Sequence, residues 1–103
     1  MKKFDLNIGE KAKEYLYQAG TTFHLYEGIV GSGWSARSAV LVGNGKPENG
    51  SFFPLIDDDI TVWIPENMEF VQDIVDIQAV GFLWNTYLVA ASAVTGSKAG
   101  CGR

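Results

Sequence analysis

The feature that most constrains the fold is the pattern after residue 20, where short runs rich in Val, Ile, Thr and aromatic residues alternate with clusters of Gly, Asn, Asp and Pro. Runs of this composition and length favour β-strands, and the clusters between them favour turns. The pattern predicts strands over residues 22–27, 34–42, 51–56, 60–64, 74–81 and 86–93. It predicts a loop over 43–50 and hairpin turns at 57–59 and 84–85.

Within the first twenty residues, the spacing of the apolar residues changes once. Apolar residues first alternate with polar ones, which is typical of a short strand with one buried face, at Phe4, Leu6 and Ile8. Helical spacing then takes over, at Ala12, Tyr15, Leu16 and Ala19. Asn7 is predicted to cap this helix together with Glu10, and Gly20 to end it. The whole chain is therefore expected to be mainly β, a compact β sandwich of about six or seven short strands with one N-terminal α-helix.

The length and charge of the chain restrict its organisation and its partners. The 103 residues are enough for one domain, predicted over 1–95, followed by a flexible tail over 96–103. The net charge is −4 and the eight basic residues are mostly scattered, which disfavours nucleic acid and anionic membranes as partners. No apolar run approaches the roughly 20 residues that cross a bilayer. We expect a cytoplasmic protein.

Two segments and one residue carry groups that could form a chemical site. The run 57–59, three aspartates, supplies the oxygen ligands that calcium or magnesium prefers, but it lacks the later glycine and glutamate of a calcium loop, which favours a solvated turn. The glycines and lysine of 43–47 do not form a phosphate-binding loop, and no hydrolytic triad is indicated. His24, the one imidazole, is expected to be an ordinary strand residue. The sequence does not predict an enzyme.

The order of the segments resembles the HesB-like, or A-type iron–sulfur carrier, family. The resemblance covers nearly the whole chain: a strand and helix at the start, Gly31-Ser32-Gly33-Trp34 before a long strand, and Gly100-Cys101-Gly102 at the end. Intermediate segments are similar to family motifs as well, at residues 59–64, 65–68, 74–77 and 81–82. The resemblance implies a HesB-like fold and a role in iron–sulfur cluster biogenesis, with iron or a cluster as cofactor, and a homodimer or an assembly protein as partner.

Family members bind metal through three cysteines, and this chain keeps one of them. Gly31 stands where the first cysteine is expected and Ala99 where the second is expected, so Cys101 alone remains as a metal ligand. One thiolate cannot complete a cluster or a tetrahedral metal site. A dimer would supply two Cys101 thiolates, with His24 as the only imidazole of each chain.

Three functions from different classes follow from these observations. In the first, a divergent HesB-like protein handles iron, zinc or a cluster through Cys101. In the second, a non-catalytic binding module contacts a protein or small ligand through a surface near the vacated cysteine position, comprising Gly31, Ser32, Gly33, Trp34 and Trp84. In the third, Cys101 is a redox-active thiol on the tail.

Overall fold

The computed structural model describes residues 4–31, 33–82 and 85–94, and the elements follow one another as the sequence pattern predicts, with two additional 3-10 turns. The strands are β1 (Asp5–Ile8), β2 (Thr22–Val30), β3 (Arg37–Asn44), β4 (Phe52–Asp57), β5 (Ile60–Pro65), β6 (Ile74–Phe82) and β7 (Asn85–Ala90). The helical elements are α1 (Glu10–Ala19) and the 3-10 turns η1 (Gly33–Ser35) and η2 (Val71–Asp73).

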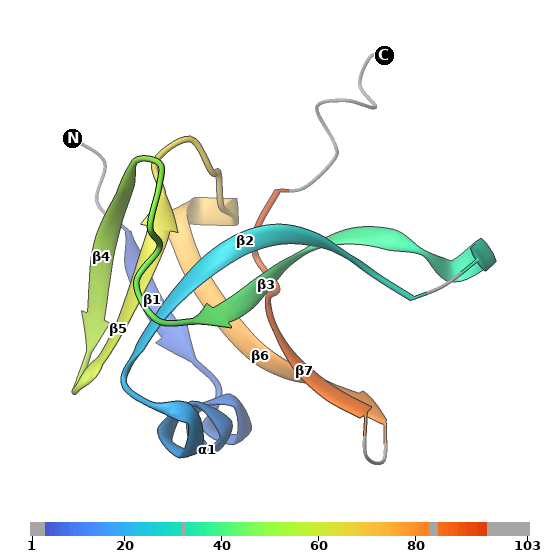
Figure 1. Ribbon diagram of the computed structural model, residues 1–103, viewed down its shortest axis with the longest axis horizontal. Helices are drawn as coiled ribbons and strands as arrows, with labels where there is room; N and C mark the ends of the chain where they lie inside the picture. The colour runs from blue at the N-terminus through green and yellow to red at the C-terminus, as the bar shows by residue number, and fades with distance from the viewer. Residues whose placement is uncertain (1–3, 32, 83–84, 95–103) are drawn as a thin grey trace.

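The seven strands form one sheet, in the order β1-β6-β7-β3-β2-β5-β4 (Figure 1). The two edge strands, β1 and β4, lie next to each other, so the sheet nearly closes into a barrel. The ring of Phe4 stacks on that of Phe53 across this seam, with 5.4 Å between ring centroids. The prediction of a mainly β fold with one N-terminal helix is confirmed. In place of two stacked sheets, the strands form a single curled one.

Two parallel pairings make this closure possible, and the local sequence pattern gave no sign of them. β1 pairs with β6 and β2 pairs with β5, each in parallel. Both pairs join segments that are far apart in the chain, so their register depends on tertiary packing. The remaining neighbours, including the β2–β3, β4–β5 and β6–β7 hairpins, are antiparallel.

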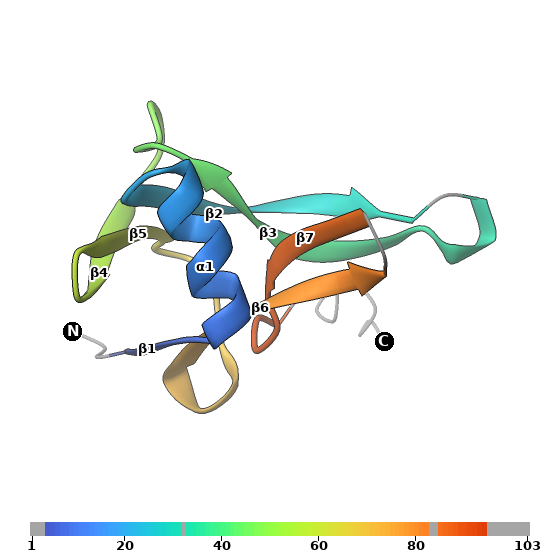
Figure 2. The same ribbon diagram turned by 90° about the horizontal axis from the view of Figure 1, so that it is seen from below.

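The core fills the inside of the curled sheet, and α1 closes one end of it (Figure 2). The helix buries Ala12 and Leu16, as its apolar spacing predicts. The largest fully buried side chains all come from this helix and four of the strands: Phe23, Leu16, Leu25, Ile60, Ile64, Ile77, Val40, Val62 and Val75. None of the described helices has the length and apolar character that crossing a bilayer requires.

The predicted cap of α1 is wrong. Gly9 occupies the N-cap position with no side-chain hydrogen bond, and Glu10 is the first helical residue. Asn7 instead continues β1 opposite Asp76, and its Nδ2 donates a hydrogen bond of 2.8 Å to the Asp76 carboxylate. The parallel pairing with β6 therefore determines the role of Asn7. The end of the helix is as predicted, because the Gly20 N–H donates to the Leu16 carbonyl.

Three predicted strands have bounds that differ by three residues at one end. The strand predicted over 22–27 continues to Val30. The strand predicted from Trp34 begins only at Arg37, because residues 33–35 form η1. The strand predicted to reach residue 93 ends at Ala90, where the chain turns and the Ala93 N–H donates to the Ala90 carbonyl. Ser92 holds this turn against β6: its Oγ donates to the Ile74 carbonyl and accepts from the Asp76 N–H.

Candidate binding site on the arm of the second hairpin

One half of the β2–β3 hairpin belongs to the body of the protein, and the other half projects from it (Figure 1). Near the body, Phe23, Leu25 and Val40 are at most 2% exposed. Val40 pairs with Glu27 and is the last buried residue toward the tip. We call residues 28–39 the arm. In the arm the strands still pair, from Gly28 with Ala39 to Val30 with Arg37, but the body no longer covers them.

The tip of the arm presents an indole to solvent. Gly31 and Gly33 both have positive φ, 85° and 53°, a conformation that L side chains other than Asn and Asp rarely adopt. These two glycines curl the chain into η1, and the Ala36 N–H donates to the Gly33 carbonyl at 3.3 Å. Trp34, in the middle of η1, is fully exposed. The structure thus brings together Gly31, Gly33 and Trp34 of the predicted surface. Ser32 and Trp84, which that surface also included, lie outside the described residues.

The arm also has open strand edges. Within the described part of the chain, the pairing of β2 with β5 ends at His24, and β3 pairs with β7 only at Leu41. Beyond these points each arm strand has one paired neighbour, the other arm strand. Unpaired strand edges offer main-chain hydrogen bonds to another chain. Ile29, 67% exposed, adds an apolar side chain to the same region.

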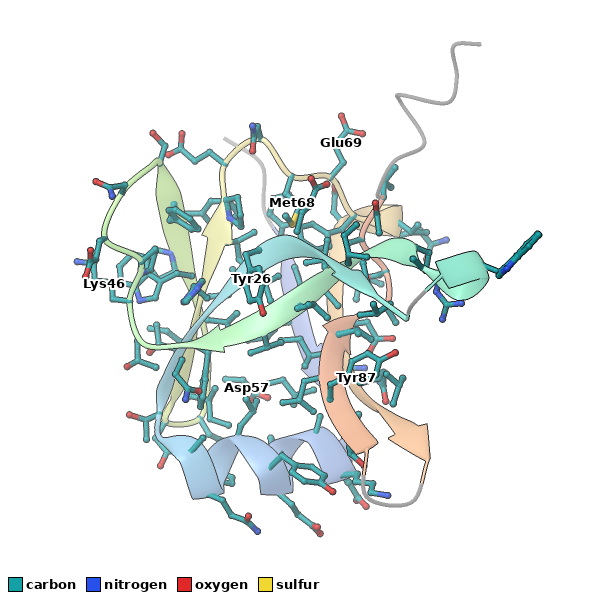
Figure 3. All side chains as sticks on the ribbon, turned by 45° about the vertical axis from the view of Figure 1, so that its right-hand side comes forward. Tyr26, Lys46, Asp57, Met68, Glu69 and Tyr87 are labelled. Atoms are coloured by element: carbon teal, nitrogen blue, oxygen red, sulfur yellow. The ribbon has the colours of Figure 1, made fainter. Side chains whose placement is uncertain are left out.

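At the base of the arm, His24 has a structural environment. Its Nδ1 lies 3.0 Å from the Gly45 carbonyl, and its ring packs at a tilt against Tyr26. A Cβ atom added to Gly43 would lie 2.6 Å from His24 Nε2, so the ring occupies the space that a side chain at 43 would need. Figure 3 shows Tyr26 on the outer surface of this hairpin. His24 therefore packs on the sheet over a glycine, and its contacts agree with an ordinary strand residue.

The turn predicted at 57–59 is present: Asp58 and Asp59 form it, and Asp57 is the last residue of β4, opposite Ile60. The turn is also attached to α1. Lys13 Nζ lies 3.4 Å from Asp57 and 3.6 Å from Asp58, and the Tyr17 hydroxyl donates a hydrogen bond of 3.0 Å to Asp59. A lysine ammonium from the helix thus faces two of the carboxylates that could have served as cation ligands.

These contacts shift two pKa values. Burial by itself would lower the pKa of Lys13, but the hydrogen bond and charge of Asp57, with the charge of Asp58, outweigh it and raise that pKa. The hydrogen bond to Asp59 raises the pKa of Tyr17, and partial desolvation and the charges of Asp59 and Asp58 raise it further. At neutral pH Lys13 and Tyr17 are therefore both protonated where they contact the aspartates of the turn.

The predicted metal ligand, Cys101, and the tail over 96–103 lie outside the described residues. Across residues 4–31, 33–82 and 85–94, no three His, Cys, Asp or Glu side chains are grouped so that they could hold a metal ion.

A second surface feature was not anticipated from the sequence. An open hollow of about 550 Å³ lies between the start of β4 and the end of β5, lined by Asn49, Gly50, Ser51, Phe52, Pro65, Glu66 and Asn67. Phe52 and Pro65 are a directly opposed cross-strand pair and are half-buried. The Glu66 N–H donates to the Ser51 carbonyl and joins the two sides. The register of the hairpin brings these residues together, and the sequence predicted only the turn at 57–59 that joins the two strands.

Comparisons of the chain with protein-family models, with curated proteins and with solved structures found no match. The HesB-like family therefore stays a prediction from the sequence motifs.

Proposed function

We propose that this protein is a non-catalytic binding module that attaches to a protein partner through the β2–β3 arm. The observation that carries the proposal is the fully exposed Trp34 at the tip of a projecting hairpin. A large apolar side chain with no intramolecular packing gains free energy when a partner buries it, and tryptophan is among the residues that most often dominate protein interfaces.

Two neighbouring features support the same function. The arm strands have open edges that another chain can pair with, and Ile29 lies beside them. Arg37, the first residue of β3, is exposed next to η1. Arginine and tryptophan together are the typical anchors of an interface, one by hydrogen bonds and charge and the other by apolar area. The fold in this proposal is a scaffold that holds the arm away from the body.

The test is the capture of a partner on immobilised protein from an extract of the native cell. Wild type is compared with Trp34→Ala and with Tyr15→Ala, which truncates another exposed aromatic residue, 39% exposed on α1. A protein retained by wild type and by Tyr15→Ala, and lost with Trp34→Ala, supports the proposal. Equal retention by wild type and Trp34→Ala contradicts it.

The resemblance to the carrier family supports a second candidate, metal or cluster handling in the cytoplasm through Cys101. The observation that favours it is the segment Gly100-Cys101-Gly102, which keeps one family cysteine between glycines. Metal and sulfide content after anaerobic purification and attempted cluster reconstitution tests it. Iron or zinc that is lost in Cys101→Ser supports this candidate, and about half a metal per chain indicates a site shared by two chains. Metal-free protein in both forms contradicts it.

A further inference from the structure

The arm and the rest of the chain differ in charge. Arg37 is the single charged residue of the arm, and the whole chain carries −4, so the remainder of the chain carries −5. The arm is therefore complementary in charge to the body of the same protein. It is also apolar, because Ile29 and Trp34 are its most exposed large side chains. The surface that fits it would combine an apolar floor with an acidic rim.

The hollow between β4 and β5 has this combination. Its floor holds the opposed pair Phe52 and Pro65, and Glu66 is in its rim. Its volume, about 550 Å³, lies within the range of roughly 300–1,000 Å³ that is usual for small-molecule sites, so it has room for an indole. Two further exposed carboxylates, Glu48 and Glu69, lie within three residues of the lining segments, and Figure 3 shows Glu69 directed away from the body.

The nearest basic residue in the sequence is Lys46, three residues before Asn49, and it lies over Trp63, which shares a face of β5 with Pro65. Lys46 Nζ lies 4.8 Å from the centroid of the Trp63 ring, a cation–π contact that directs the ammonium toward the indole. In Figure 3, Lys46 lies beside the sheet on the side away from Glu69. Among the residues that line the hollow, Glu66 is the charged one, and the others are polar, apolar or glycine.

The arm of a given chain lies far from its own hollow. In Figure 1 the η1 turn is at the extreme right of the molecule, and the start of β4 with the end of β5 is at the upper left. We propose that the arm docks in the hollow of a second copy of this chain, with Trp34 on the floor formed by Phe52 and Pro65 and with Arg37 facing Glu66. This inference rests on the proposed function of the arm and names its partner.

Sedimentation equilibrium over a range of concentrations tests the proposal. We expect wild type and Tyr15→Ala to self-associate, and Trp34→Ala to raise the dissociation constant by about thirtyfold or more, as loss of a central interface anchor does. A wild type that stays monomeric at millimolar concentration overturns the inference. So does self-association that Trp34→Ala leaves unchanged. Chemical unfolding of each variant shows that it is folded.

A charge exchange locates the contact. Arg37→Glu and Glu66→Arg each place like charges together and should weaken self-association by about tenfold or more, while the double variant restores it. An equimolar mixture of the two single variants should associate more tightly than either alone, because the acidic arm of one meets the basic rim of the other. Failure of both the double variant and the mixture overturns the assignment of the hollow.

The outcomes separate this inference from the proposed function. If wild type is monomeric but capture from the extract still depends on Trp34, the arm binds a different protein and only the identity of the partner is wrong. If capture and self-association are both independent of Trp34, the proposed function fails too. A small molecule that binds the hollow without self-association of the chain also overturns the inference.

Discussion

The two halves of the β2–β3 hairpin have the same backbone pairing but opposite surroundings. At the base, Leu25 is fully buried, and at the arm, Ile29, four residues further along the same strand and on the same face, is 67% exposed. Burial of apolar area supplies most of the stability of a fold, so the base contributes to it and the arm does not. The comparison shows that strand pairing extends a structure beyond its core, and that side chains there are free to serve contacts.

The largest expected effect is at the base of the hairpin. Leu25→Ala should lower the free energy of unfolding by about 2–5 kcal/mol, because it removes buried methyl groups and leaves a cavity. Chemical denaturation measures the change. Ile29→Ala is the matched control on the same strand and should change stability by less than about 0.5 kcal/mol. Similar losses in the two variants would show that the arm also packs against the body.

The next effect tests how closely the outer face of the hairpin is packed. Gly43→Ala places a methyl group against the His24 ring, which must then leave its position beside Gly45 and Tyr26. We expect a loss of about 1–2 kcal/mol, from strain and a weakened hydrogen bond. Thermal or chemical unfolding measures it. The same change in a His24→Ala background should cost much less. An equal cost in both backgrounds would show that something other than the ring limits the space.

A smaller effect is expected at alkaline pH, where α1 meets the β4–β5 turn. The pKa values of Lys13 and Tyr17 are raised in the folded state. Their contribution to stability is therefore fully present below the unfolded values of 10.5 and 10.0 and is lost as pH rises above them. Unfolding curves should show a lower free energy of unfolding at pH 11 than at pH 8, and this difference should be smaller in Tyr17→Phe. An identical difference in the variant would show that Tyr17 does not contribute to this pH dependence.

The smallest effect on stability is expected at the tip of the arm. Trp34→Ala should leave the free energy of unfolding within about 0.5 kcal/mol of wild type, because the indole is fully exposed. Chemical denaturation at concentrations well below those used for self-association makes the comparison for the monomer. A marked destabilisation there would mean that Trp34 packs within its own chain, which would weaken the case for the arm as a binding element.

Much of the secondary structure was predictable because it depends on local pattern. The alternation before residue 9, the helical spacing of Ala12 and Leu16, and the turn residues at 57–59 each express a period or a backbone preference that nearby residues set. The cap at Asn7 was mispredicted for a tertiary reason. The side chain that would cap an isolated helix is instead paired with Asp76 across β1 and β6.

The candidate site was predictable in part. The glycines at 31 and 33 and the tryptophan between a turn and a strand indicated a surface at the right place in the chain. They did not show that β2 and β3 would extend beyond the body, since that depends on where β5 and β7 stop pairing with them. The hollow lined by Phe52, Pro65 and Glu66 could not be predicted for the same reason, because it depends on the pairing of two strands.

The sequence by itself determined the mainly β class, the single helix, the hairpin turn after Asp57 and the charge difference between the arm and the body, because each depends on composition or on neighbours in the chain. The tertiary structure alone decided the order of the strands, the parallel pairings that curl the sheet and the exposure of Trp34. These depend on which distant segments share a core, and contacts between segments far apart in the chain leave no local period in the sequence.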